Sequence, residues 1–329
     1  MKKINELNDI ESISVFYKGM ALGYERQKNV LFISEDIGNV IYKVPFKRNL
    51  LAIMEDKLFA SDNDLYVYDE VLKEFVLYRE SLGGGRVNIF NGNFIENKYE
   101  RPDKFVRVTM YKGKSNIKLW EKSYFNRISW FCRDSYLYVT DLSFKYIDFI
   151  DAQTGEVKNT LHFENPPISR FIYNYEDTLI VSLEIQPLEE YLLLGLDART
   201  GQEKWRIEDA RDLYIQDMEQ GCLYGIGGNL FQVIDVKNGK MLVYERLSSE
   251  IEKYKVFPDR QGCLSPKGLY FKSNHLDCKL GLINLQTLKI EFVIDLNLPA
   301  GVKITSMSYH NGRLYVKDTN DMLHIFAEE

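Results

Sequence analysis

The chain has 329 residues and a formal net charge of −6, from 48 acidic and 42 basic residues. This balance disfavours a nucleic-acid partner, because such proteins need a basic stripe to displace counterions. Hydrophobic residues make up 45% of the chain, yet no apolar run approaches the roughly 20 residues of a membrane span. We expect a globular protein with a sizeable core, no membrane segment and no nucleic-acid partner.

The N-terminal segment, residues 1–19, has a basic start but no apolar stretch long enough for a secretory signal peptide. The four cysteines, Cys132, Cys222, Cys263 and Cys278, have no paired close spacing. Reduced thiols of this kind are typical of cytosolic proteins. We therefore expect a cytoplasmic location.

Short apolar pairs recur along the whole chain, at Leu31-Phe32, Leu58-Phe59, Phe94-Ile95, Leu137-Tyr138, Leu179-Ile180, Leu223-Tyr224, Leu269-Tyr270 and Leu314-Tyr315. From Phe94 onward, successive pairs are 43, 42, 44, 46 and 45 residues apart. Apolar and polar residues alternate around them, which indicates β-strands rather than helices. A repeat of about 40–45 residues with four short strands is typical of a β-propeller blade.

A second repeated pattern marks hairpin tips. Its strongest copy is Leu196-Asp197-Ala198-Arg199-Thr200-Gly201-Gln202-Glu203-Lys204-Trp205. Weaker copies occupy residues 150–157, 234–240 and 283–288, and the last of these has lost the glycine. The copies combine an Asp or Asn with a Thr or Asn and, except in the last, a Gly, and these residues favour a tight Asx-type turn between two strands.

The spacing Asp197-x-x-Thr200-Gly201-x-x-x-Trp205 resembles the repeat of the PQQ-like β-propellers, a family that includes the quinoprotein dehydrogenases. The resemblance implies that Asp197 caps the turn, that Thr200 and Gly201 form it, and that Trp205 packs between blades. None of these residues is catalytic in the family. The chain lacks the adjacent cysteine pair of the dehydrogenases, so we expect no quinone or other cofactor.

We predict an all-β fold: a single β-propeller domain over residues 1–329, in which the N-terminal segment, residues 1–19, contributes a strand that completes the last blade. Such closure removes the open sheet edges of the ring. If residues 12–17 form the closing strand, the ring has eight blades and the first is incomplete. If residues 39–44 form it, seven blades follow an N-terminal extension. The eight apolar pairs favour eight blades.

Two motifs suggest ligand chemistry but fit a structural interpretation better. Gly225-Ile226-Gly227-Gly228 looks like a phosphate-binding loop, yet it leads into a strand instead of a helix, so we interpret it as a hairpin turn. Residues 274–278 bring His275, Asp277 and Cys278 together, but no second cluster supplies the remaining ligands of a metal site. We expect no metal site and find no motif for a catalytic triad.

Acidic residues gather in the loops that the predicted strand order places on one face of the ring. These are Glu35, Asp36, Asp62, Asp64, Asp141, Glu189, Glu190, Asp318 and Asp321, with Glu164, Asp209, Asp212 and Glu250 in the connections between blades. The opposite face carries Lys112, Lys114, Arg199, Lys237, Lys240 and Lys289. A charged face can steer a partner of opposite charge. As binding residues we single out Asp62, Asp64, Glu189, Glu190, Asp318 and Asp321.

These features favour a monomeric, non-enzymatic propeller that binds another protein of basic character. A specific hypothesis is a bacterial immunity protein that neutralises a basic toxin. The alternative is an enzyme, a hydrolase or lyase, in which carboxylates from several blades meet in the central funnel. Such an enzyme is expected to hold carboxyl groups of raised pKa in a deep pocket.

Overall fold

The computed structural model describes residues 1–25, 28–46, 50–54, 56–61, 63–82, 86–90, 92–100, 105–113, 115–125, 127–131, 136–141, 145–163, 169–185, 190–211, 213–217, 219–273 and 278–328. These residues form β-strands and one short helix, α1 (Ser248–Tyr254). This helix is too short to cross a membrane, and the described residues include no other helix that could do so.

The strands pair into four-stranded antiparallel sheets, each built from consecutive strands except the last. The first four sheets are β2 (Ile10–Tyr17), β3 (Met20–Glu25), β4 (Asn29–Ser34) and β5 (Val40–Pro45); β6 (Leu50–Met54), β7 (Lys57–Ser61), β8 (Leu65–Asp69) and β9 (Glu74–Arg79); β10 (Arg86–Phe90), β11 (Asn93–Glu100), β12 (Phe105–Tyr111) and β13 (Lys118–Phe125); and β14 (Arg127–Phe131), β15 (Tyr136–Asp141), β16 (Tyr146–Asp151) and β17 (Val157–His162). The other four are β18 (Ser169–Tyr175), β19 (Thr178–Ile185), β20 (Glu190–Asp197) and β21 (Glu203–Glu208); β22 (Leu213–Asp217), β23 (Cys222–Gly227), β24 (Leu230–Asp235) and β25 (Lys240–Arg246); β26 (Pro258–Ser265), β27 (Gly268–Ser273), β28 (Lys279–Asn284) and β29 (Lys289–Asp295); and β30 (Ile304–His310), β31 (Arg313–Asp318), β32 (Leu323–Ala327) and β1 (Lys2–Leu7).

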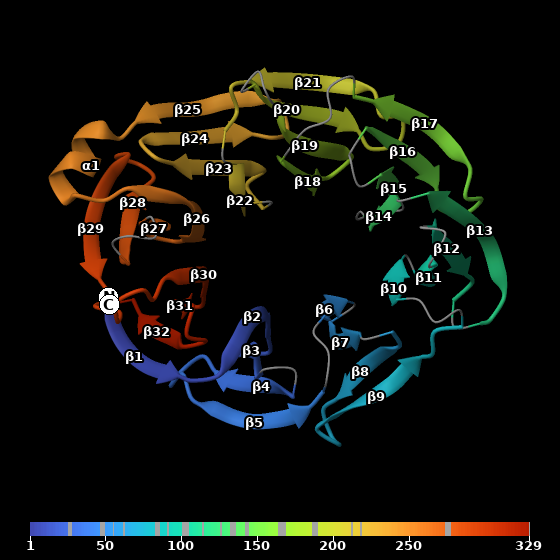
Figure 1. Cartoon of the computed structure of the whole chain (residues 1–329), viewed down its shortest axis with the longest axis horizontal. Helices are drawn as coiled ribbons and strands as arrows, with labels where there is room; N and C mark the ends of the chain where they lie inside the picture. Colours follow the sequence, from blue (N-terminus) through green and yellow to red (C-terminus); the bar gives the residue numbers. More distant parts are fainter. Residues whose placement is uncertain are drawn as a thin grey trace.

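The eight sheets stand in a ring around a central axis, with the first strand of each sheet innermost and the fourth on the rim (Figure 1). The fold is therefore an eight-bladed β-propeller, and the predicted fold class is confirmed. We number the blades 1 to 8 in chain order, beginning with β2–β5.

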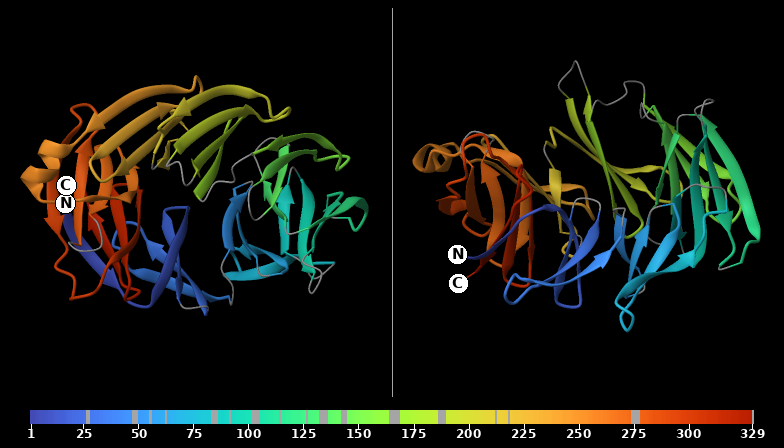
Figure 2. Two further views of the ribbon diagram at one scale, coloured as in Figure 1. Left: turned by 45° about the horizontal axis from the view of Figure 1, so that its top comes forward. Right: turned by 60° about the horizontal axis from the view of Figure 1, so that its bottom comes forward.

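The N-terminal strand closes the ring, as predicted. β1 pairs with β32 on the rim of blade 8, where Lys3 lies opposite Phe326. The two chain ends lie side by side in every view (Figures 1 and 2). Because β32 then has a partner on its outer side, the last sheet has the same four strands as the others.

Neither candidate for the closing strand, residues 12–17 or residues 39–44, is correct, although the closing strand does come from residues 1–19. Residues 12–17 lie in β2, the innermost strand of blade 1, and that blade has four strands of its own. The closing strand is Lys2–Leu7, which is polar and largely exposed because it lies on the rim. A rim strand buries little apolar surface, so it lacks the alternation by which a strand is recognised in sequence.

The first two apolar pairs, at Leu31 and Leu58, are only 27 residues apart, and this short spacing is why an incomplete first blade was expected. Leu31-Phe32 lies in β4, a third strand, whereas the other seven apolar pairs lie in second strands. The second strand of blade 1 is β3, which contains Ala21 and Leu22, both fully buried.

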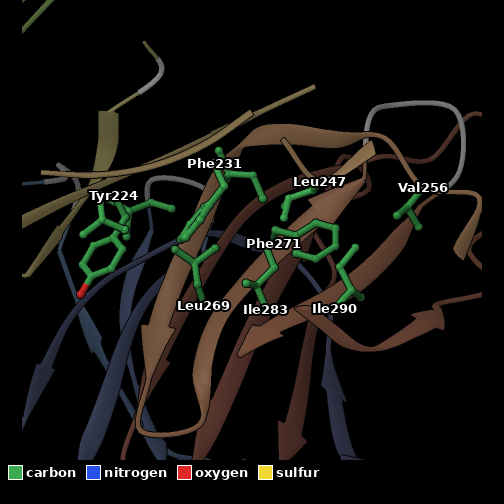
Figure 3. Close-up of a cluster of buried hydrophobic side chains, with 11 residues drawn as sticks. Tyr224, Phe231, Leu247, Val256, Leu269, Phe271, Ile283 and Ile290 are labelled. Atoms are coloured by element: carbon green, nitrogen blue, oxygen red, sulfur yellow. The ribbon is translucent and has the colours of Figure 1, made fainter. Parts of the chain in front are cut away.

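The core lies between neighbouring blades, where both faces of each sheet are covered. Figure 3 shows the junction of blades 6 and 7, in which Phe231 packs with Leu269, Phe271 and Ile283. All four side chains are fully buried. Burying one such side chain contributes about 1.5–3 kcal/mol to the free energy of unfolding, so each junction is a substantial part of the fold's stability.

Candidate functional site

The two faces of the ring carry different loops. We call the face with the loops between second and third strands, and with the connections between blades, the connection face. We call the face with the loops between first and second and between third and fourth strands the hairpin face. Consecutive turns of an antiparallel sheet alternate between its two ends, so this division follows from the strand order.

Two of the predicted binding residues, Asp62 and Glu189, lie outside the described residues. Glu190 is the first residue of β20, on the connection face. Asp64 lies in the loop before β8, where its Oδ1 accepts a hydrogen bond of 2.7 Å from the backbone N–H of Ser81. This bond ties the connection after blade 2 to a loop of the same blade, so the Asp64 carboxylate already serves the fold.

The other two predicted residues lie at the end of β31, also on the connection face. Asp318 is 2% exposed and accepts hydrogen bonds from the backbone N–H groups of Asn320 (2.8 Å) and Met322 (3.0 Å). Asp321 forms an ion pair of 2.8 Å with Lys317. Asp318 therefore shapes a turn, and the charge of Asp321 is partly neutralised.

Asp318 also belongs to a buried cluster that the sequence did not reveal. His324, which is 3% exposed, lies 3.0 Å from Asp318 through Nε2 and 2.9 Å from Glu6 through Nδ1. Glu6 belongs to β1, His324 to β32 and Asp318 to β31, so one imidazole links three adjacent strands of the closing blade. No short-range motif announces this cluster, because Glu6 and His324 are 318 positions apart.

Two acidic residues assigned to the connection face lie on the hairpin face instead. Glu35 and Asp36 follow β4, a third strand, because the pair Leu31-Phe32 was counted as a second strand. Glu35 is 6% exposed, and its Oε2 accepts a hydrogen bond from Asn311. This carboxylate therefore joins blade 1 to blade 8 rather than facing solvent.

The hairpin-tip motif has the predicted turn geometry. Asp197 Oδ1 accepts hydrogen bonds from the backbone N–H groups of Arg199 (3.0 Å) and Thr200 (2.8 Å) and from the Thr200 hydroxyl (2.9 Å). These bonds hold the pKa of Asp197 below its ordinary value although burial of the carboxyl opposes them. A copy missed in the sequence occurs at Asp69, which accepts from Val71 and Leu72 in the same way.

Trp205 packs between blades, as the family resemblance implies. Its indole lies against Gly195 on β20 of its own blade and against Gly239 in the turn before β25 of the next. A Cβ atom at either glycine would overlap the indole ring. The absence of a side chain at these two positions is what admits the tryptophan.

An aromatic ring also packs on a turn glycine of the next blade at the two preceding junctions, between blades 3 and 4 and between blades 4 and 5. Trp120 of β13 lies over Gly155 in the blade 4 turn, and its Nε1–H donates a hydrogen bond of 2.8 Å to the Ala152 carbonyl. Phe149 of β16 lies over Gly201 in the blade 5 turn. The motif glycine therefore provides a seat for an aromatic ring from the preceding blade.

The copy without glycine differs at this position. In the blade 7 turn the glycine position is Leu288, a partly buried residue that packs against the hydrophobic cluster at the junction of blades 6 and 7.

The other sequence motifs have structural roles where they are described. Gly227 pairs with Leu230 across a two-residue turn, so the glycine-rich stretch is a hairpin, as predicted. Of the possible metal-binding stretch only Cys278 is described, and its thiol donates to the Val302 carbonyl at 2.9 Å.

The enzyme alternative gains no support from the carboxyl groups of the described chain. Those with a clearly shifted pKa have it lowered by hydrogen bonds and nearby cations, which outweigh burial, and they are Glu25, Glu70, Glu121, Asp151, Asp177, Asp197, Asp209 and Asp235. A general acid needs the opposite shift. Within the same residues, no group of three His, Cys, Asp or Glu could hold a metal ion.

No protein-family model and no curated protein sequence matches the chain. Solved structures do match. The computationally designed Ika8 protein is 9% identical, with a TM-score of 0.66 over 100% of both chains. The likeness is one of fold.

Two natural propellers match over nearly their whole length. BamB from Moraxella catarrhalis, a PQQ-like repeat β-propeller, is 11% identical, with a TM-score of 0.59 over 99% of this chain and 97% of its own. Sqt1 from Saccharomyces cerevisiae is 9% identical, with a TM-score of 0.59 over 99% of both chains. The PQQ-like resemblance therefore holds at the level of the fold.

Proposed function

We propose that this propeller is a non-enzymatic scaffold that binds another protein on its connection face. The observation that carries the proposal is helix α1, which the connection between blades 6 and 7 adds to this face. None of the α1 residues is buried, although Leu247 and Val256 on either side of it are (Figure 3). A rigid scaffold that presents a variable, exposed segment is suited to recognition.

The finer form of the proposal is electrostatic. A basic partner, such as the toxin that an immunity protein neutralises in the cytoplasm, would be attracted by a chain of net charge −6. Because Asp64, Asp318 and Asp321 each serve a contact within the fold, we assign the steering role to Asp62, Glu189 and Glu190.

The test compares two triple charge reversals in the full chain. The first, which we call the connection-face reversal, is Asp62→Lys, Glu189→Lys and Glu190→Lys, at the positions that the sequence predicts on that face. The matched control is Glu74→Lys, Glu176→Lys and Glu219→Lys, three exposed residues beside loops of the hairpin face. Both variants change the net charge equally. A partner is captured from the source cell, purified, and its association rate with each variant is measured at low salt and at 0.5 M salt.

We expect the connection-face reversal to slow association at low salt by about tenfold or more, because long-range charge acts on encounter. Added salt should reduce the difference, since the Debye length falls to about 10 Å at 0.1 M and further above it. The control should associate at the wild-type rate. Equal rates for both variants would refute steering, and slowing by the control alone would move the interface to the hairpin face.

A further inference from the structure

A pocket of about 420 Å³ opens on the connection face where blades 5, 6 and 7 meet. Its walls come from the connection at Asp209 and Arg211, the turn at Gly228 and Asn229, and residues 257–260. The volume is within the range of about 300–1,000 Å³ that small-molecule sites occupy.

The walls are held in place from beneath. Gln232 of β24 is fully buried; its Nε2 donates to the Asp209 carbonyl at 2.9 Å and its Oε1 accepts from the Arg211 backbone N–H at 2.8 Å. The backbone N–H of Gly228 donates to the Pro258 carbonyl at 3.0 Å, which joins the other two walls. Such anchoring favours binding because little order has to be imposed by a ligand.

Both carboxylates of the pocket already have cationic partners. Asp209 accepts from Arg211 Nε (2.5 Å) and from the Tyr244 hydroxyl (2.9 Å). Asp259 forms an ion pair of 3.1 Å with Lys272, a residue that is 8% exposed. Neither carboxylate therefore adds an uncompensated negative charge to the pocket.

The lining carries three arginines against these two aspartates: Arg211, Arg246 and Arg260. Arg246 is exposed at the end of β25 and adds a second positive charge near Asp209, which Arg211 already pairs. Counted over its lining residues alone, the pocket has one more arginine than aspartate, although the whole chain carries a net charge of −6. Guanidinium groups bind carboxylate and phosphate oxygens through paired hydrogen bonds.

Aromatic rings stand beside these cations. Phe257 and Tyr244 line the pocket and are 52% and 44% exposed. Tyr191 lies beneath the Arg211 guanidinium, 4.7 Å from it, and is covered on that side. The two exposed rings offer flat apolar surface within the same cavity as the arginines.

We propose that this pocket binds a small organic anion in which a phosphate or carboxylate group is attached to a flat ring. The oxyanion lies against Arg246 and Arg260, and the ring packs on Phe257 and Tyr244. The proposal does not depend on the protein-binding function, since it requires no partner chain.

The test uses four probes on the full-length chain, with dissociation constants from ligand-observed NMR titrations. Phenyl phosphate and benzoate carry both features, inorganic phosphate carries only the anion, and benzyl alcohol carries only the ring. We expect phenyl phosphate or benzoate to bind at least about tenfold more tightly than either partial probe, because the two contacts act together. Equal binding of all four probes, or no binding of the first two, would overturn the proposal.

Variants locate the site. Arg246→Gln should raise the dissociation constant of phenyl phosphate or benzoate, whichever binds more tightly, by about tenfold, as expected for loss of a charged hydrogen-bonding partner. The matched control is Arg206→Gln, since Arg206 is also an exposed arginine but lies outside the pocket, paired with Glu203 on β21. Phe257→Ala should reduce the affinity to that of inorganic phosphate. Each variant must first show the wild-type thermal transition.

Equal weakening by Arg246→Gln and Arg206→Gln would mean that only the overall charge matters, and it would refute the assigned site. Unchanged binding in both Arg246→Gln and Phe257→Ala would do the same. Should Arg246→Gln fail to fold, Arg260→Gln provides the same test, because Arg260 on β26 is the other arginine assigned to the oxyanion.

Discussion

At the scale of single residues, the junctions depend on a match between one aromatic ring and one glycine. Trp205 requires Gly239 because no other residue leaves room for the indole, and Gly239 has a φ of 61° that side chains rarely adopt. A glycine is thus required at this position for two reasons: the backbone has a positive φ, and the indole of the neighbouring blade leaves no room for a side chain. Substitutions can separate the two effects.

Gly239→Ala should be more destabilising than Gly312→Ala. Both glycines have a positive φ, but a Cβ at Gly312 has no atom within 4 Å, whereas one at Gly239 overlaps Trp205. We expect Gly312→Ala to lower the free energy of unfolding by about 1 kcal/mol through backbone strain alone. Gly239→Ala should lower it by at least about 2 kcal/mol more, because the new Cβ overlaps the indole. Urea denaturation measures the free energy of unfolding of both variants. Equal losses of stability would contradict the close packing of Trp205 on Gly239.

Trp205→Ala should lower the free energy of unfolding by about 3–5 kcal/mol, as other large-to-small core changes do. In this background, Gly239→Ala should cost no more than Gly312→Ala, because the overlapping ring is gone. Denaturation of the double variant tests this. A loss below about 1 kcal/mol for Trp205→Ala would mean that the indole contributes little at the junction.

The Asp197 carboxylate should make the fold sensitive to acid. Its pKa is lowered in the folded chain, so its contribution is present above the unfolded pKa and is lost as the pH falls through the folded pKa. Asp197→Asn keeps an acceptor oxygen but cannot titrate. Between pH 6 and pH 2.5 the wild type should therefore lose more stability than the variant. Parallel losses in urea titrations would contradict this.

At the scale of elements, the rim strand β1 matters more than its composition suggests. It buries little apolar surface, but it satisfies the outer edge of β32 through a ladder from Lys2 opposite Ala327 to Leu7 opposite Leu323. An unpaired edge offers a template for aggregation. Removal of this strand therefore exposes a sheet edge rather than a core.

Deletion of residues 1–7 should lower the thermal midpoint and cause concentration-dependent aggregation, visible by light scattering. A chain in which Lys2 and Lys3 are changed to Ser keeps the strand and serves as the control. A synthetic peptide of residues 1–9 should restore solubility when added to the truncated chain. A truncated chain that stays monomeric, with the wild-type midpoint, would contradict closure by β1.

At the scale of the whole molecule, the seam between the chain ends carries polar bonds that close the ring. Arg313 Nε donates to the Glu35 carbonyl at 2.9 Å, and the Ile10 backbone N–H donates to the Asp321 carbonyl at 2.8 Å. Within blade 8, His324 bonds to carboxylates on both neighbouring strands. Closure thus relies on directional contacts in addition to apolar packing.

His324→Ala should lower the free energy of unfolding by about 2–4 kcal/mol, because it leaves the buried Asp318 carboxylate without its imidazole partner. The control is His162→Ala, an exposed histidine at the end of β17, which should change stability by less than about 0.5 kcal/mol. Thermal and urea unfolding measure both. Similar effects from the two variants would show that the seam cluster contributes little.

The sequence by itself determined the all-β class, the repeated four-strand unit, closure by an N-terminal strand and the turn chemistry at Asp197. The class, the four-strand unit and the turn depend on residues close together in the chain, where alternation and turn composition act locally. Closure followed from the general rule that a ring of blades leaves no open sheet edge. The seat of Trp205 followed from the family resemblance.

Only the tertiary structure decided which strand closes the ring, which acidic residues serve the fold and where the pocket with three arginines lies. β1 meets β32 across almost the full chain, and His324 links Glu6 of β1 to the buried Asp318 of β31. The pocket combines residues from three blades. Burial and charge pairing are set by contacts between distant segments, and no local pattern in the sequence encodes them.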